Sequence, residues 1–389
     1  LLGALAGVFY TQGFIWGFCF LALSFVTLVA TSYVLGAKAS QNIGITTEIA
    51  LILTFTIGLL LTTTALPSYV TVAVSVVVML ILALRTKTPE LYKIFHRKEV
   101  EELIVFAIIV FVVFPFLPDR SITLSSLPLL SDGQFDLGKY ATLELINPRK
   151  LWYVVLLLTG IDVFGHILSK FIGKKRGVTF TSFLAGFASS TSATQSLAQK
   201  SKYSSTSSYL VGAALLANTA SFFQILLLVG PLNPAWMGFL LPTIGILIIS
   251  GLLLSTFFLR KKEPVEDTGV DEGPKKIFSL IPALKFSLLL IGVKLVTKVC
   301  LLTFGQSGFL VSSVLASLAG LDAILITLAE SAGKSISFEF ALLAFLLVNA
   351  TNLVSKMAYS YFLGGKPFAK KFSIGAVIII GASTLGLIF

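Results

Sequence analysis

Polar and ionisable side chains interrupt two apolar segments of this 389-residue chain. Asp322 lies in the middle of one segment, and a carboxylate deep in an apolar helix is costly unless it faces a partner or water. The other segment carries four hydroxyls in a row, at Ser189, Ser190, Thr191 and Ser192. Together these oxygens could bind a cation or carry a proton, with Asp322 as the metal ligand and an inorganic cation as the cofactor. The alternative is that Asp322 caps a helix or pairs with a lysine.

Asparagines lie near both polar clusters. Asn218 lies within the apolar run 207–229, and Asn349 lies within the run 338–363 with Thr351 and Asn352 less than one helical turn away. These side chains could complete an oxygen-lined site. They could equally hold neighbouring helices together through hydrogen bonds, and the sequence leaves both interpretations open.

Charged side chains four residues apart form two further pairs. Asp162 and His166 would share one helix face, and Lys294 and Lys298 would share another. We expect a buried pair between Asp162 and Lys294, with a proton relay as the alternative. Glu48 opens another apolar run, where it could compensate the helix dipole or bind a ligand.

Membrane helices must position these residues. Hydrophobic residues make up 56% of the chain and charged residues 12%, against about 25% charged in soluble domains. Apolar runs near the length that crosses a bilayer recur throughout, so we predict an all-α polytopic membrane protein with about 10 to 13 membrane helices. The predicted spans are residues 13–35, 44–63, 66–84, 102–117, 151–172, 178–198, 207–229, 236–259, 279–304, 309–329, 338–363 and 372–389.

The charge pattern argues against a nucleic-acid-binding protein or an enzyme. The net charge is +11, but the basic residues sit in short clusters between apolar runs, as orientation signals do. Two histidines and two cysteines occur, and no phosphate-binding loop, zinc-ligand cluster or nucleophile motif is present in the sequence. We therefore expect a lipid bilayer and a small ion or small molecule as partners, and leave a homo-oligomer open.

An internal repeat organises the second part of the chain. Its offset is 131 residues, the separation of Asn218 from Asn349, and it also aligns Gly177 with Gly308. The copies cover about 150–259 and 279–389. All large basic clusters fall on the cytoplasmic side only if segments 178–198 and 309–329 are re-entrant or broken helices. Each copy then crosses the membrane three times, and because this number is odd the two copies are inverted relative to each other. The alternative is two ordinary spanning helices with small residues for close packing.

Four ordered motifs resemble one membrane family, the MgtC/SapB-type proteins that carry a C-terminal domain of unknown function. The motifs are Gly44–Ala50, Leu117–Arg120, Asn147–Trp152 and Ser189–Thr194. The resemblance implies an MgtC-like transmembrane region over 1–117 whose first helix is absent, an extracytoplasmic loop over 118–149 and an inverted-repeat domain over 150–389. It also implies a link with magnesium transport or stress physiology, without a proven reaction.

Inverted repeats with broken helices are typical of secondary transporters. We therefore expect a secondary transporter or ion-coupled carrier in the plasma membrane of a prokaryote, with its site between the two repeats. The favoured ligand is a cation: magnesium, sodium or a proton. The alternatives are a membrane-embedded regulator of another complex and a lipid-translocating protein.

Overall fold

A computed structural model describes most of the chain, which divides into two compact units, Leu1–Pro118 and Asp119–Phe389. The described residues are 1–40, 46–63, 70–71, 73–75, 78, 97–126, 138–141, 143–172, 177–203, 207–260 and 280–388. Within them, seven helices are long and apolar enough to cross a membrane. The chain is thus a multi-pass α-helical membrane protein, as predicted.

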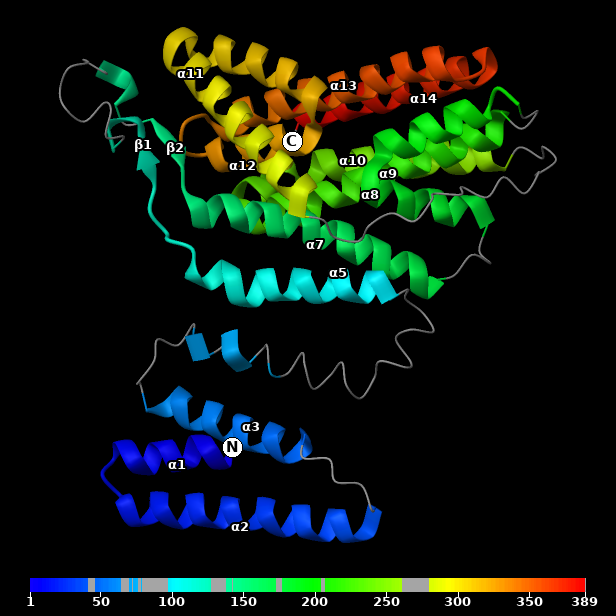
Figure 1. The fold of residues 1–389 in the computed structure, drawn as a ribbon. Coiled ribbons are helices and arrows are strands. Elements are labelled where there is room, and N and C mark those ends of the chain that lie inside the picture. Colours follow the sequence, from blue (N-terminus) through cyan, green and yellow to red (C-terminus); the bar gives the residue numbers. More distant parts are fainter. Residues whose placement is uncertain are drawn as a thin grey trace. The chain divides into compact units, whose positions relative to one another are not determined.

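The first unit is helical. Its elements are α1 (Leu2–Thr11), α2 (Ile15–Ser40), α3 (Thr46–Thr62), α5 (Arg97–Ile108), η1 (Ile109–Val113) and η2 (Phe114–Phe116), labelled in part in Figure 1. Helices α1 and α3 approach closely because Gly3 and Gly58 carry no side chain: a Cβ at Gly3 would lie 2.1 Å from the Phe55 carbonyl oxygen. The predicted span 66–84 falls largely outside the described residues.

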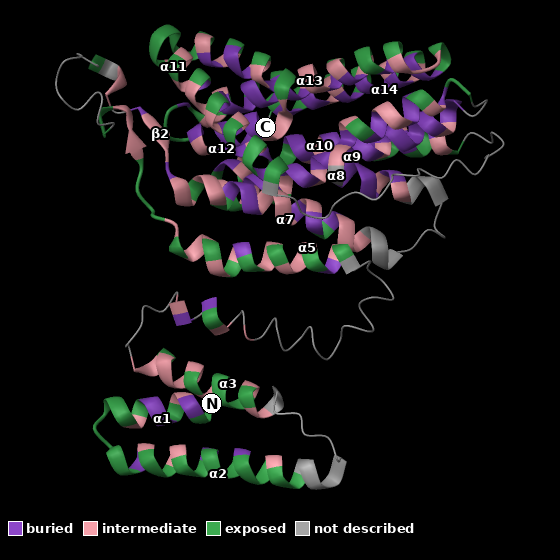
Figure 2. Cartoon of the chain, in the orientation of Figure 1, coloured by how far each residue is buried: buried purple, intermediate pink, exposed green. Residues whose placement is uncertain are grey.

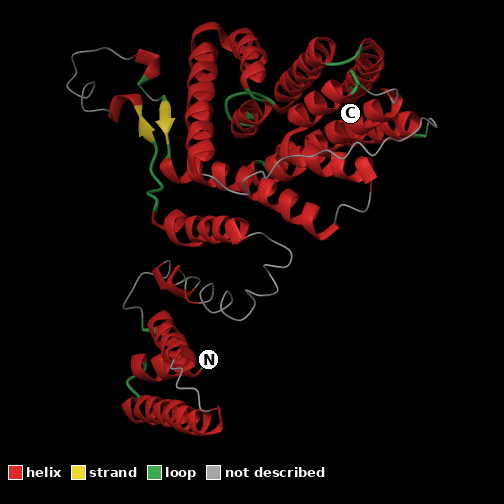
Figure 3. Ribbon diagram, turned by 45° about the vertical axis from the view of Figure 1, so that its right-hand side comes forward, coloured by secondary structure: helices red, strands yellow, loops and turns green. Residues whose placement is uncertain are grey.

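The second unit begins with a small antiparallel sheet, coloured yellow in Figure 3, and continues as helices. Its elements are β1 (Ile122–Thr123), η3 (Leu124–Ser126), η4 (Gly138–Tyr140), β2 (Glu144–Ile146), α7 (Pro148–Ile172), α8 (Gly177–Lys200), α9 (Ser207–Leu232), α10 (Pro234–Leu259), α11 (Leu280–Ala319), α12 (Leu321–Ser331), α13 (Phe338–Leu363), α14 (Lys366–Ser383) and η6 (Thr384–Leu387).

Helix α9 forms the centre of the second unit. It is the most extensively buried of the seven candidate spans and appears mostly purple in Figure 2. Its apolar residues are distributed around the whole helix rather than along one stripe, as expected for a helix enclosed by neighbours. Helices α8 and α10 flank it, and both share long contact surfaces with it.

Side-chain contacts define the two ends of this unit. At one end the Ser201 hydroxyl accepts a bond from the Gly365 amide (2.9 Å), which joins the α8–α9 and α13–α14 connections. At the other, Asn233 donates to the carbonyl of Ala332 (3.0 Å), which joins the α9–α10 and α12–α13 connections. We call these the Lys200 end and the Asn233 end.

Helix α8 enters and leaves at the Lys200 end, so it is a re-entrant hairpin (Figure 1). The preceding helix, α7, starts at the Asn233 end beside the small sheet, and its 25 residues carry the chain to the Lys200 end, where Gly177 begins α8. The hairpin breaks at Ser189, where φ is −169° and ψ is 103°. We call residues 177–200 hairpin 1.

The second copy contains the inverse arrangement. The chain turns at Gly305 (φ +63°), returns towards the interior, and breaks at Gly320 before α12. Both ends of this segment lie at the Asn233 end of the unit. Phe309 contacts Phe340 at the start of α13, and the Ala332 carbonyl accepts a hydrogen bond from Asn233. We call residues 306–331 hairpin 2. The two hairpins enter from opposite ends, so the prediction of an inverted repeat with two re-entrant helices is confirmed.

Candidate functional site

A cavity of about 370 Å³ lies where the tips of the two hairpins meet. Helices α7, α9 and α13 complete its wall, and most of the lining side chains are polar. The lining residues are Asp162, Ser189, Ser190, Thr191, Ser192, Ser221, Gln224, Ile225, Leu228, Ser317, Leu318, Ala319, Gly320, Leu321, Asp322, Asn352, Ser355 and Tyr359. The structure thus brings together the predicted hydroxyl cluster, Asp322, Asn352 and Asp162.

The cavity wall is built from matching positions of the two repeat copies. Several lining residues form pairs that are separated by the repeat offset of 131, and the pairs come from both tips and from α9 with α13. These pairs are Ser189 with Gly320, Thr191 with Asp322, Ser221 with Asn352, Gln224 with Ser355, and Leu228 with Tyr359. The cavity therefore lies where the two inverted copies face each other.

The tip of hairpin 1 presents a helix start to the cavity. Ser189 caps the second half-helix, since its hydroxyl accepts a hydrogen bond from the Ser192 amide (3.2 Å). The Thr194 hydroxyl donates to the Ser190 carbonyl (2.7 Å). The positive end of this half-helix therefore points to the cavity together with the predicted hydroxyls.

The tip of hairpin 2 presents a second helix start, and Asp322 lies in its first turn. Gly320 precedes this helix and offers no side-chain cap. A carboxylate in the first turn compensates the helix dipole, so Asp322 combines that role with a place in the cavity wall. Its side chain is half-buried, although it lies deep in the protein, because it faces the cavity.

The residue that the sequence interpretation missed is Lys356 of α13, which is 1% exposed. Its Nζ donates to Ser190 Oγ (2.8 Å) and to Asn218 Oδ1 (2.7 Å). Asn218 in turn donates to Thr194 Oγ1 (3.1 Å). Its charge also interacts with that of Asp322. The signal was a single basic residue inside an otherwise uncharged stretch of a membrane helix.

Residues 156–364 match the family described as "Domain of unknown function (DUF4010)", which is more than half of the chain. The chain belongs to the DUF4010 family. The match includes both hairpins and the helices that carry Asn218 and Lys356. No curated protein and no solved structure matches the chain.

Asn349 shows that the two repeat copies of this chain are not chemically symmetric. It is the mate of Asn218 and is equally buried, yet neither its Nδ2 nor its Oδ1 has a hydrogen-bond partner in the described structure. The mates of Ser190, Thr194 and Lys356 are Leu321, Leu325 and Ile225, which offer no polar atom. Thr351 bonds within its own helix, to the Leu347 carbonyl (2.8 Å).

The expected pairing of Asp162 with Lys294 needs correction. The Lys294 Nζ lies 2.5 Å from Glu330 Oε2, and Asp162 lines the cavity. Hairpin 2 folds back onto α11 and so brings α12, with Glu330 near its end, against Lys294. His166 is half-buried on α7, one turn beyond Asp162, and is not a lining residue of the cavity.

Lys298 belongs to a separate charged group at the Asn233 end. Its Nζ lies 3.9 Å from Glu144 on β2. Burial alone would raise the pKa of the Glu144 carboxyl, but the hydrogen bond from Ser121 and the charges of Lys150, Lys298 and Lys294 lower it below its ordinary value. This group holds the small sheet, which lies outside the predicted membrane segments, to α11.

Glu48 lies in the first unit, in the first turn of α3. It lines a cavity of about 410 Å³ with apolar side chains of α2, including Phe25 and Val29. Its Oε2 is buried without a hydrogen-bond partner in the described structure. A carboxylate at this place can compensate the dipole of α3.

Carboxylates and histidines do not gather into a metal centre within the described ranges: no group of three or more His, Cys, Asp or Glu side chains could hold an ion. Asp322 is instead surrounded by hydroxyls, amides and Lys356. A metal ion at Asp322 would have to take neutral oxygens as its remaining ligands and would meet the charge of the lysine.

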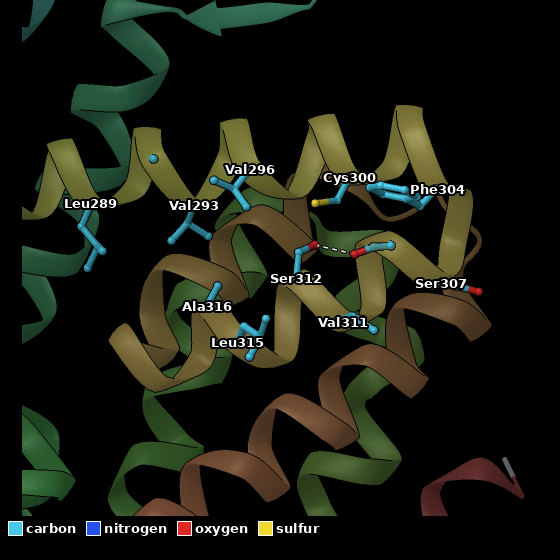
Figure 4. A pocket seen from close by; sticks show the side chains of 12 residues that line it. Leu289, Val293, Val296, Cys300, Phe304, Ser307, Val311, Ser312, Leu315 and Ala316 are labelled. Carbon is cyan, nitrogen blue, oxygen red and sulfur yellow. Dashed lines mark hydrogen bonds between the residues drawn. The ribbon is translucent and has the colours of Figure 1, made fainter.

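A second, larger hollow of about 700 Å³ lies between the two arms of α11 (Figure 4). Its wall is almost wholly apolar, with Leu289, Val293 and Val296 on one arm facing Leu315 and Ala316 on the other. The Ser312 hydroxyl turns back to the Gly308 carbonyl of its own helix (2.7 Å). This hollow suits hydrocarbon rather than an ion.

Proposed function

We propose that this DUF4010 protein is a secondary transporter of the prokaryotic plasma membrane, with the cavity between the two hairpin tips as its solute site. The observation that carries the proposal is the wall made of repeat-equivalent residues from two inverted copies. Transporters built from inverted repeats place their sites at the repeat interface, near the bilayer midplane and beside broken helices.

The broken helices support a binding role. Each break leaves backbone amides and carbonyls without helical partners, and such groups are tolerated at membrane depth only in a protein-lined cavity. Two helix starts, at Ser190 and Leu321, face the same space. Exchange of conformation between the two copies would open the cavity first to one side and then to the other.

The lining chemistry favours a small polar solute and a coupling cation. Hydroxyls, amides and the carboxylates of Asp162 and Asp322 offer hydrogen bonds and negative charge to a solute. Magnesium, sodium and the proton are the candidate cations. The likeness of residues 1–117 to MgtC/SapB-type proteins adds magnesium as a candidate cargo.

Counterflow in proteoliposomes tests the proposal. The purified full chain would be screened with labelled cations, amino acids and organic acids, preloaded inside and traced outside. We expect one solute to exchange, and we expect Asn352→Trp, which fills the cavity, to abolish the exchange. Val354→Trp is the matched control, because Val354 is 53% exposed on the outer face of the same helix.

Two results would overturn the proposal. One is that no solute of the panel exchanges faster than in empty liposomes although the protein is folded. The other is that a folded Asn352→Trp variant exchanges its solute as fast as the wild-type protein, since the cavity would then have no part in transport.

The apolar hollow on α11 supports a second candidate function, lipid translocation, because its volume and lining suit an acyl chain. A fluorescent-lipid assay in the same liposomes separates the two functions. Accelerated exchange of lipid between leaflets without solute counterflow would favour lipid translocation.

A further inference from the structure

Lys356 lies in an environment that would suit an inorganic cation. Its ammonium is in contact with two neutral oxygens, Ser190 Oγ at 2.8 Å and Asn218 Oδ1 at 2.7 Å. The carboxylate of Asp322 provides the nearby negative charge. Hard cations in proteins are held by the same types of group, namely hydroxyl, amide and carboxylate oxygens. The ammonium, however, is covalently tethered.

The ammonium joins three elements that belong to both repeat copies. Lys356 comes from α13 of the second copy, whereas Ser190 is at the tip of hairpin 1 and Asn218 is on α9 of the first. The mates of these three residues are Ile225, Leu321 and Asn349, which together could not hold a cation. The cation-like site therefore occurs in one copy of the repeat.

We infer that the Lys356 ammonium replaces a bound metal ion in this site and that the transporter is coupled to protons. This inference rests on the proposed function. One proton would pass from Nζ to the Ser190 hydroxyl, which lines the cavity and would release its own proton to water there, and the neutral amine would no longer balance the charge of Asp322. The charge-assisted bond to Ser190 would also weaken, which frees the tip of hairpin 1. Uptake of a proton from the other side would restore both interactions.

The other charged groups considered on the packed elements either line the cavity or have partners that do not line it. Asp322 on α12, Asp162 on α7 and Tyr359 on α13 line the cavity. On α11 and α12, Lys294 is paired with Glu330, and Lys298 lies beside Glu144 at the Asn233 end. Lys371 on α14 donates to Ser207 and Ser208 at the Lys200 end.

Thermal unfolding of the purified full chain tests the role of Lys356. The wild-type melting temperature should not change when sodium or magnesium replaces choline at constant ionic strength. Lys356→Ala leaves an ammonium-sized space, so sodium or methylammonium should raise the melting temperature of this variant by about 2–4 °C. Lys371→Ala is the matched control, because Lys371 also donates to two hydroxyls, but those of Ser207 and Ser208 do not line the cavity as that of Ser190 does, and it should show no such rise.

The outcome that overturns the inference is a saturable rise of the wild-type melting temperature with sodium or magnesium. A folded Lys356→Ala variant without a response to either cation would do the same. If Lys356→Ala does not fold, the wild-type protein still decides the question through its own response to metals.

Flux measurements separate this inference from the proposed function. Counterflow without any ion gradient reports the proposed function alone. In a wild-type protein that shows counterflow, we expect a pH gradient to drive uptake of the solute in the absence of sodium. Uptake driven by sodium but not by pH would reject proton coupling and leave the transporter proposal intact.

Discussion

Lys356 is buried, and the half-buried carboxylate of Asp322 at the cavity is the negative charge that interacts with it, so the stability of the protein should depend on the two residues together. Asp322→Asn removes the negative charge beside a lysine that is 1% exposed, and it leaves that lysine unbalanced. Breaking a buried pair on one side commonly costs about 3–5 kcal/mol, and the loss here should be smaller because Asp322 is half-buried at the cavity, whereas replacing both partners is often nearly neutral. We therefore expect Asp322→Asn to lower stability and Asp322→Asn with Lys356→Met to recover most of the loss.

A double-mutant cycle on unfolding in detergent measures this coupling. Thr191→Ala serves as a comparison, because it deletes one neutral oxygen from the mate position of Asp322 and should cost less. Losses that simply add in the double variant would show that the two charges are independent.

Asn218 and Asn349 offer a second comparison between equivalent positions. Asn218→Leu removes the oxygen that accepts from Lys356 and the amide that donates to Thr194. Leaving a buried partner unpaired lowers the free energy of unfolding by about 1–3 kcal/mol. Asn349→Leu removes an amide whose polar atoms have no partner in the described structure, so it should be neutral or stabilising. Equal losses in the melting temperatures of the two variants would contradict this expectation.

Much of the cavity wall could be predicted from the sequence, because hydroxyls and a carboxylate inside apolar runs need partners or water. Ser189, Thr191, Asp322 and Asn352 all line the cavity. Lys356 could not be assigned in this way, because a lysine in the last turns of a membrane helix can extend its charge to the interface. Only the tertiary structure shows that it points inward, to Ser190.

At the scale of elements, the two hairpins break at equivalent positions, Ser189 and Gly320, although these residues differ. The sequence predicted breaks in these segments because small and polar residues interrupt the apolar runs. The pairing of the hairpins with their neighbours could not be predicted in the same way. Lys294 has Glu330 as its partner only because hairpin 2 folds back on α11, and that contact depends on the turn at Gly305.

Close packing of hairpin 1 on α9 gives the third prediction. A Cβ at Gly186 would lie 2.2 Å from the Ala217 carbonyl oxygen, so Gly186→Ala must push the two elements apart. We expect a loss of about 1–3 kcal/mol, typical of overpacking, with a weaker interaction between Asn218 and the tip. Circular dichroism and thermal unfolding of the purified variant would measure the loss.

Gly238→Ala is the matched control on α10, where a new Cβ would meet nothing within 4 Å. Replacing a helical glycine by alanine without a clash should stabilise the protein slightly. Should Gly186→Ala prove as stable as Gly238→Ala, hairpin 1 would be packed more loosely on α9 than the structure indicates.

At the scale of the whole molecule, the structure gives the inverted arrangement that the basic clusters predicted for the second unit. Lys202 and Lys366 lie at the Lys200 end and Lys334 at the Asn233 end, all three exposed. The positive-inside rule then predicts a cytoplasmic Lys200 end. The repeat made this arrangement predictable, since four full crossings in each copy would give parallel copies, whereas three crossings and a re-entrant hairpin give inverted ones.

Cysteine labelling from each side of the membrane tests the arrangement. In a background without Cys19 and Cys300, Lys202→Cys and Lys366→Cys should react from the cytoplasmic side and Lys334→Cys from the opposite side. Labelling of Lys202→Cys and Lys334→Cys from the same side would remove the inverted-repeat argument.

The bond from Lys356 to Ser190 has a further consequence for which way the empty protein faces. It holds the tip of hairpin 1, which closes the cavity towards the Lys200 end. The equivalent residues Ile225 and Leu321 cannot form such a bond at the tip of hairpin 2. A hydrogen bond to a charged group contributes about 1.5–3 kcal/mol, which corresponds to roughly a tenfold to hundredfold bias between two states. The tip of hairpin 1 is therefore held more strongly than the tip of hairpin 2. Without solute we expect the cavity to be closed towards the cytoplasm and to open more readily towards the outside.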